Sequence, residues 1–128
     1  MDETKLESTD AEAEAMRDSV LSMAVEAWRF GRVFDRLLGR LDAGETNRYR
    51  SQFNWFMKKV EDSLNGAGLR IVNVEGQPFD PGMAATPLNI EEFDVSEPLV
   101  VDQMLEPIIM GGNGIVKTGT VTLRKAEQ

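Results

Sequence analysis

The chain of 128 residues contains no cysteine and no histidine. Without cysteine there can be no disulfide framework and no thiolate nucleophile. Zinc sites usually draw on Cys and His, and nucleophile systems of the Ser-His-Asp and Cys-His types need a histidine, so these classes of site are excluded. Any catalysis would have to rest on carboxylates, lysine or tyrosine. We therefore expect a protein that is not an enzyme and that uses no metal or other cofactor.

Positive charge and long apolar runs are also scarce. The chain has 22 acidic and 14 basic residues, which gives a net charge of −8 and a pI near 4.6. Phosphate backbones repel such a chain, so nucleic acid is not an expected partner. No apolar run reaches the roughly 20 residues of a transmembrane helix, and the acidic N-terminus lacks the apolar segment of a signal peptide. We expect a cytoplasmic protein that makes no membrane contact.

Apolar residues recur with a seven-residue period between residues 10 and 41, where there is no proline. They are separated alternately by four and three residues, which is the a/d pattern of a helix that packs against other helices. Trp28, Val33 and Leu38 widen this stripe, and a widened stripe favours a helical bundle over a two-stranded coil. The members of the repeat are Met16, Val20, Met23, Ala27, Phe30, Phe34, Leu37 and Leu41.

A second helix is predicted at about residues 46–64, after a stop at residues 42–44 with Gly44 just past the end of the first helix. Two helices joined by a short link form an antiparallel hairpin, which cannot cover both of its apolar stripes. We therefore expect a homodimer in which two hairpins form a four-helix bundle. The expected dimer interface comprises Val20, Met23, Ala27, Phe30, Phe34, Leu37 and Leu41 of the first helix and Phe53, Phe56 and Val60 of the second.

After residue 68 the chain changes to short β-rich runs separated by prolines and glycines. A glycine-rich stretch at 111–114 lies between two apolar runs, as in a β-hairpin with an Asn-Gly turn. The predicted strands are residues 69–74, 99–105, 108–110, 115–117 and 120–124. The fold class is thus α+β. We expect a disordered acidic segment at 1–10, a helical dimerisation region at 11–67 and a small, mostly antiparallel β domain at 68–126.

The glycine-rich stretch at 111–114 also has some features of a phosphate-binding loop. Gly111 stands six residues before Lys117, as that motif requires. However, Val116 occupies the position where the motif has a glycine, and a predicted strand follows in place of a helix. A hairpin turn is therefore the favoured interpretation.

Two clusters of charged residues have a simple and a functional interpretation. The acidic cluster could hold a cation or a carboxylate pair, but it lacks calcium-loop spacing and the aromatic platform of a glycosidase, so a solvated loop is favoured. The basic stripe beside the heptad is best explained by salt bridges along the helix, and docking of an acidic partner is the alternative. The clusters are Glu91, Glu92, Asp94 and Glu97, and Arg29, Arg32, Arg36 and Arg40.

Two short stretches near the middle of the chain have a distinctive sequence. They are Leu64-Asn65-Gly66-Ala67-Gly68-Leu69, at the end of the second helix, and Gly76-Gln77-Pro78-Phe79-Asp80-Pro81. These two stretches resemble the sequences of the GrpE family, the nucleotide exchange factors of DnaK-type chaperones. The order of the parts is similar to that of the family: paired long helices, a short helix that adds to a four-helix bundle, and then a β domain.

The resemblance implies a homodimeric co-chaperone that binds the ATPase domain of a DnaK-type chaperone. Binding would hold the nucleotide cleft open and promote ADP release through differential affinity, without covalent chemistry. Gly68 would let the chain turn from helix into β domain, and the partner would touch an exposed edge of that domain. The expected partner-binding residues are Gly68, Met83, Met110, Gly111, Asn113 and Lys117.

The chain departs from the family pattern at two positions. Where the family has a histidine and then an alanine after Phe-Asp-Pro, this chain has Ala84 and Thr86. The helix before Phe34 is also shorter than the family's stalk. These departures keep an alternative open, in which the protein is a dimeric structural or adaptor protein with the same fold and no exchange activity.

Overall fold

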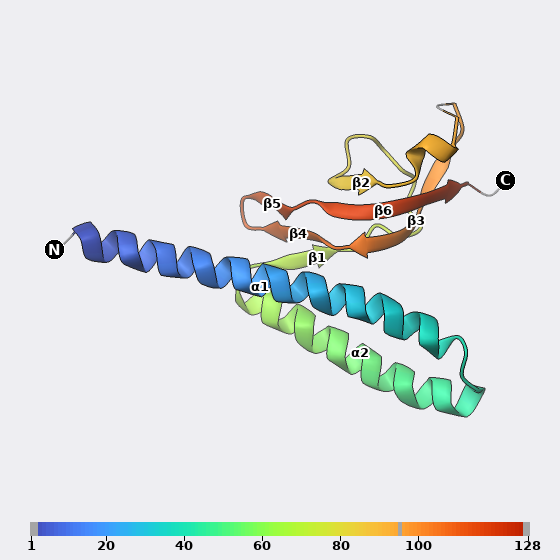
Figure 1. Ribbon diagram of the computed structural model, residues 1–128, viewed down its shortest axis with the longest axis horizontal. Coiled ribbons are helices and arrows are strands. Elements are labelled where there is room, and N and C mark those ends of the chain that lie inside the picture. The colour runs from blue at the N-terminus through green and yellow to red at the C-terminus, as the bar shows by residue number, and fades with distance from the viewer. Residues whose placement is uncertain (1–2, 95, 127–128) are drawn as a thin grey trace.

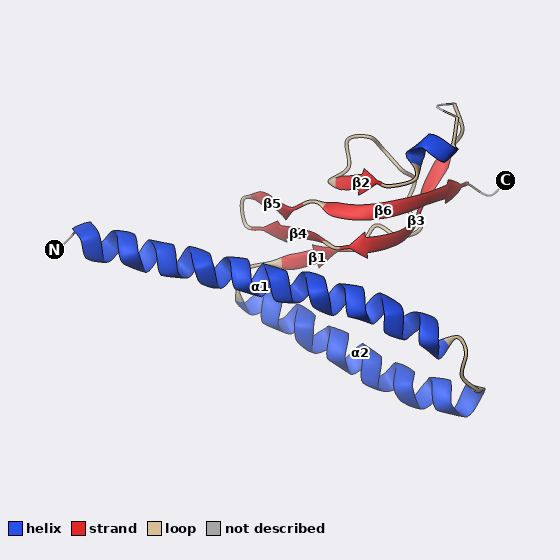
Figure 2. Cartoon of the chain, viewed as in Figure 1, coloured by secondary structure: helices blue, strands red, loops and turns tan. Residues whose placement is uncertain are grey.

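The structure is a computed structural model that describes residues 3–94 and 96–126, with side chains from residue 9 onward (Figure 1). Its elements are α1 (Glu3–Leu38), α2 (Ala43–Gly66), β1 (Arg70–Val72), β2 (Ala85–Pro87), a short 3₁₀ helix η1 (Ile90–Glu92), β3 (Leu99–Glu106), β4 (Ile108–Gly111), β5 (Gly114–Lys117) and β6 (Gly119–Lys125). The two helices lie side by side, and the strands lie on one side of them (Figure 2). The expected α+β class is confirmed.

Helix α1 begins earlier than the sequence suggested. We assigned residues 1–10 to a disordered segment, but α1 already runs from Glu3, and residues 1–2 lie outside the described part of the chain. No glycine or proline interrupts this stretch, and acidic residues in a first turn interact favourably with the helix dipole. The N-terminal part of α1 consequently projects beyond the rest of the molecule (Figure 1).

The break between the helices also differs from the expected one. Helix α1 ends at Leu38, and Gly44 lies inside the first turn of α2 instead of past the end of α1. Asp42 is the N-cap of α2, because its carboxylate accepts a hydrogen bond from the Glu45 N–H at 2.9 Å. The Thr46 hydroxyl donates to the Leu38 carbonyl at 3.0 Å and ties the two helix ends together. An aspartate that caps a following helix stabilises that helix, which explains the early start of α2.

Helix α2 ends at the glycine-containing motif that the sequence indicated. Gly68 has a φ of +77°, a conformation that side chains other than glycine rarely adopt. Its N–H donates to the Asn65 carbonyl, and the Leu69 N–H donates to the Leu64 carbonyl at 2.9 Å. Leu64 and Leu69 are both buried, which completes a Schellman motif with its apolar contact. Gly68 therefore turns the chain from α2 into β1.

The strands form two three-stranded sheets, in the orders β1-β4-β5 and β2-β6-β3. Every pairing is antiparallel except that of β2 with β6, so the domain is mostly antiparallel, as predicted. The predicted hairpin is β4–β5, in which Gly111 pairs with Gly114 and the two residues between them form the loop. In β6, Val121 and Leu123 are buried and alternate with half-exposed residues, as the sequence pattern indicated.

The helices and the sheets pack against each other through two clusters of buried apolar residues, and Trp28 belongs to the larger one. Trp28 of α1 is buried among residues of β3, β4 and β6, and its Nε1 donates to the Met104 carbonyl at 2.6 Å. Glu75, in the connection after β1, forms an ion pair with Arg32 of α1 at 2.7 Å and accepts the Met104 N–H at 2.8 Å. The Met104 carbonyl thus bonds to Trp28 of α1, and the Met104 N–H bonds to Glu75, the ion-pair partner of Arg32. Apolar burial and this network together fix the β domain to α1.

We predict that Glu75→Gln weakens this attachment. The substitution keeps the shape of the side chain but removes its charge, and hydrogen bonds to charged groups contribute about 1.5–3 kcal/mol. Because the two side chains are 25% and 22% exposed, solvent screens part of that, and the free energy of unfolding should fall by about 1–2 kcal/mol. Urea denaturation at one protein concentration measures it. Glu61→Gln, on the exposed face of α2, is the control, and an equal loss in both variants would contradict the role of Glu75.

Candidate dimer interface and partner-contact region

One face of α1 is apolar and uncovered. It carries Met16, Met23, Phe30 and Leu37, which are 68%, 73%, 63% and 51% exposed. These residues recur every seven positions and are therefore one half of the heptad. Single exposed apolar residues are common on proteins, but a continuous row along a helix is typical of a protein-binding surface.

The other half of the heptad packs against α2. The rings of Phe34 and Phe53 stack with their centroids 5.8 Å apart. Phe53 Cε2 lies only 3.1 Å from the point where a Cβ would stand on Gly31, so the close approach of the two helices depends on that glycine. Val20 and Ala27 are half-buried on the same side. Within one chain, α2 therefore covers one half of the apolar repeat of α1 and leaves the other half exposed to solvent.

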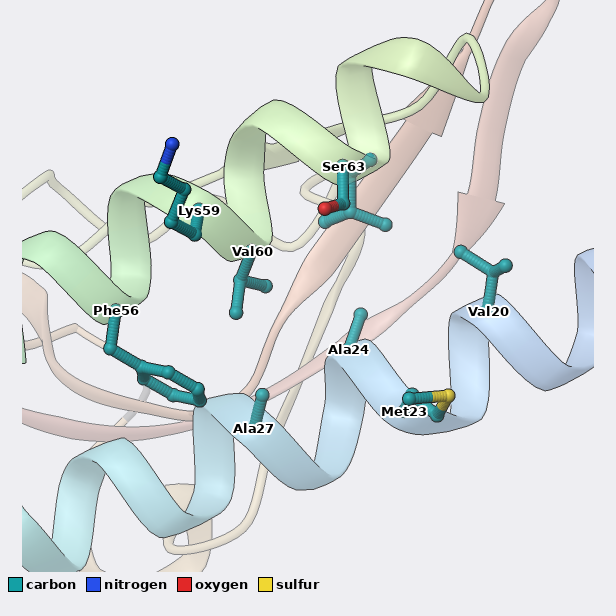
Figure 3. A pocket seen from close by; sticks show the side chains of 9 residues that line it. Val20, Met23, Ala24, Ala27, Phe56, Lys59, Val60 and Ser63 are labelled. Atoms are coloured by element: carbon teal, nitrogen blue, oxygen red, sulfur yellow. The ribbon is translucent and has the colours of Figure 1, made fainter.

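A groove lies between the two helices, next to the uncovered row (Figure 3). Its volume is about 340 Å³. Figure 3 shows Phe56 and Val60 of α2 facing Ala24 and Ala27 of α1, with the strands behind the helices. The groove thus opens on the side away from the β domain. Its lining residues are Val20, Met23, Ala24, Ala27, Phe56, Lys59, Val60, Ser63 and Leu64.

The ten expected interface residues divide into two equal groups in the single chain. Val20, Ala27, Phe34, Phe53 and Val60 are half-buried, whereas Met23, Phe30, Leu37, Leu41 and Phe56 are exposed. Sequence periodicity predicts the whole set as an interface, but it does not tell which members are covered by the other helix of the same chain. The exposed group and the groove together form one apolar surface.

Four of the six expected partner-binding residues lie together. The β4–β5 turn lies beside the connection from α2 to β1, so one hollow is lined by Gly68, Met110 and Gly111. The adjoining hollow is lined by Gly68, Asn113 and Arg17 of α1. Arg17 is a residue that the sequence reasoning missed. Its guanidinium lies 3.0 Å from the point where a Cβ would stand on Gly111.

The remaining two expected residues, Met83 and Lys117, do not line these hollows. Met83 lies in the connection before β2, where it packs against the main core and its N–H donates to the Asp80 carbonyl. Lys117 stands opposite Ile109 in the β4–β5 pairing, and its Nζ donates to the Thr118 carbonyl at 3.3 Å. Of the six expected residues, four therefore lie together beside the β4–β5 turn and these two lie apart from them.

Some members of the two charged clusters form ordinary ion pairs. Glu97 of the acidic loop pairs with Lys125 at 3.3 Å, and Arg29 of the basic stripe pairs with Glu26 at 3.5 Å. Among the described residues, no group of three or more acidic side chains is arranged to hold a metal ion. The glycine-rich turn leads into a strand, so it supplies no helix N-terminus for a phosphate.

The pKa values of Lys58 and Asp62 are shifted, and this pair has a structural role. A hydrogen bond of 2.9 Å from Lys58 to Asp62 raises the pKa of the lysine and lowers the pKa of the carboxyl group. The pair is spaced four residues apart on the solvent face of α2, where such pairs stabilise helices weakly. It lies in neither hollow and not in the groove, so it indicates no catalytic centre.

We predict that the apolar surface of α1 and α2 mediates self-association. The wild-type protein should sediment as a dimer at micromolar concentration, whereas Met23→Asp should be a folded monomer, because association would then bury an unpaired charge. Leu88→Asp is the matched control, since Leu88 is also largely exposed, at 62%, but lies after β2. Analytical ultracentrifugation and circular dichroism check both points. A Met23→Asp dimer as tight as that of wild type would rule this surface out.

Comparison with known protein families, with characterised proteins and with solved structures finds no match to this chain. In the part of the chain that the structure describes, no helix is long and apolar enough to cross a membrane. The function is therefore inferred from the surfaces of the molecule itself.

Proposed function

We propose that this protein is a GrpE-like dimeric co-chaperone, which binds the ATPase domain of a DnaK-type chaperone and promotes release of ADP. The observation that carries this proposal is the placement of two surfaces. The uncovered apolar surface lies on the side of the helical hairpin away from the strands, and the β domain lies on the other. Two chains that pair through the first surface leave both β domains free to meet another protein.

The size of the apolar surface supports the proposal of a dimer. Fully burying a Met, Phe or Leu side chain contributes about 1.5–3 kcal/mol. Met16, Met23, Phe30 and Leu37 each keep at least half of their surface exposed, and a dimer has two copies of all four, or eight side chains. Their burial would supply on the order of 10 kcal/mol, which is comparable with the roughly 4–15 kcal/mol that association costs. The Phe56 edge of the groove adds to this sum.

The residues that carry the family resemblance stand where the chain changes direction. Gly68 makes the sharp turn from α2 into the β domain. Phe79 packs against the main core, and its N–H donates to the Leu99 carbonyl at 2.8 Å. The Asp80 carboxylate accepts the Gly82 N–H at 3.0 Å and stabilises the following turn. These roles support a likeness of fold, and they leave partner binding to other residues on the surface.

The proposed activity needs only differential binding. A β domain that binds the open form of the nucleotide cleft more tightly than the closed form shifts the chaperone towards the open form, from which ADP leaves faster. The network of Trp28, Glu75 and Met104 fixes the β domain to α1. A contact region that is already ordered loses little conformational entropy on binding, so more of its interaction energy remains to hold the cleft open.

The test is a nucleotide release assay. A DnaK-type chaperone is loaded with a fluorescent ADP analogue, this protein is added, and the release rate should rise with concentration and reach a plateau. Gly112→Arg should lower the acceleration about tenfold, since losing about 1.4 kcal/mol of binding suffices for that. A Cβ at Gly112 meets no atom within 4 Å, so the side chain would project from the turn without disturbing the fold.

Gly39→Arg is the matched control, because it makes the same change in the link between the helices, far from the β4–β5 turn. It should leave the release rate unchanged. If micromolar protein neither binds the chaperone nor accelerates release while the dimer persists, the exchange function is refuted. That outcome would favour the dimeric adaptor protein with the same fold.

A further inference from the structure

Two arginines line the adjoining hollows beside the β4–β5 turn. Arg17 of α1 lines one hollow and Arg70 of β1 lines the other, and both hollows include Gly68 and Gly112. Both arginines are exposed, and among the described residues neither forms an ion pair. Arg70 donates to the thioether sulfur of Met110 at 3.6 Å, and a thioether is a weak acceptor. A guanidinium has five donors, so most of the donors of both arginines remain unused.

The β4–β5 turn adds two more donors to the hollow of Arg17. Gly112 and Asn113 form the loop of this turn, and both line that hollow. Among the described residues, their backbone N–H groups donate to no backbone carbonyl. Guanidinium groups and free backbone N–H groups are the donors with which proteins bind carboxylates and phosphates. The hollow is therefore suited to an anionic group.

The lining of both hollows contains no acidic residue. This is unusual for the chain, which has 22 acidic residues and a net charge of −8. The strands β1, β4 and β5 of the adjacent sheet contain no aspartate or glutamate either. Glu14 stands one turn before Arg17 on α1, but the two form no ion pair within the described part of the chain. The positive charge of this region is thus left for a group from outside the chain.

The shape of the region favours a protein segment over a phosphate ion. The hollow with Arg17 has a volume of about 550 Å³ and the one with Arg70 about 250 Å³. Sites of about 300–1,000 Å³ hold ligands much larger than a phosphate ion. Ile115, which is 56% exposed, also lines the first hollow and gives it an apolar border. Two separate cations beside an apolar side chain match a segment that carries carboxylates a few residues apart.

We propose that the two hollows bind an acidic segment of the partner protein. One carboxylate binds Arg17 and the N–H groups of the turn, and a second binds Arg70. The inference rests on the proposed function and gives the chemistry of the surface that the β domain meets there, which is an acidic segment of the ATPase domain. All the residues of this site belong to one chain, so the site does not depend on the dimer.

A short acidic peptide tests the site without the chaperone. Pentaglutamate added to isotope-labelled protein should shift the amide signals of Gly112 and Asn113 until they saturate, and binding should weaken as salt is raised. Arg17→Glu and Arg70→Glu should each raise the dissociation constant about tenfold, because each replaces attraction by repulsion. Arg40→Glu is the control, since it makes the same charge change in the link between the helices and should leave peptide binding unchanged.

Two variants of Gly112 test the same site with the DnaK-type chaperone. Gly112→Asp and Gly112→Asn introduce side chains of one shape that differ in charge. A Cβ at Gly112 meets no atom within 4 Å, and its φ is not among the positive ones, so both side chains fit. The aspartate should raise the dissociation constant of the complex about fivefold relative to the asparagine, because it repels a carboxylate. Both side chains are short and leave the hollow open, whereas the arginine of the release assay acts through its bulk.

The outcomes separate this inference from the proposed function. Saturable binding of pentaglutamate that both arginine reversals weaken supports the inference. It is overturned if pentaglutamate gives no shift, if uncharged pentaglutamine gives the same shifts, if inorganic phosphate binds as tightly, or if Arg40→Glu weakens binding as much as Arg17→Glu. A chaperone that binds Gly112→Asp and Gly112→Asn equally well also overturns it and leaves the proposed function intact. A chaperone that does not bind the wild-type protein refutes the proposed function, and the peptide then decides whether the acidic-segment site exists.

Discussion

The contact between α1 and the backbone of Met104 determines how the rest of the molecule is arranged. Trp28 donates to the Met104 carbonyl, and Glu75, held by Arg32, accepts its N–H. Because this network lies on one side of α1, the β domain occupies that side and α2 occupies the next. The side of α1 that neither of them covers carries the row from Met16 to Leu37.

The elements that could be predicted are those with a strong local signal. Heptad spacing located α1, and the glycine at 68 marked the passage from α2 into the β domain. The link between the helices was harder to predict, because Asp42 and Gly44 are compatible with two local structures. A glycine just past a helix end and an aspartate at the start of the next helix are both stabilising. The hydrogen bond from Glu45 to Asp42 selects the second, and a tertiary contact from Thr46 to Leu38 supports it.

The candidate site was predictable only in part, for a similar reason. Gly68 and the turn residues Met110, Gly111 and Asn113 meet because the end of α2 and the β4–β5 turn reach the same edge of the domain. Sequence alone does not show this meeting, since about 40 residues separate the two segments. Arg17 is more distant still. More than 90 residues separate it from Gly111, and no local pattern in the sequence connects the two.

The net charge of the protein opposes the dimer that we propose. A dimer carries twice −8, or −16, so general repulsion opposes association. An exposed ion pair contributes about 0–1 kcal/mol, whereas the apolar rows contribute on the order of 10 kcal/mol. In the proposed dimer the apolar surface therefore provides the affinity.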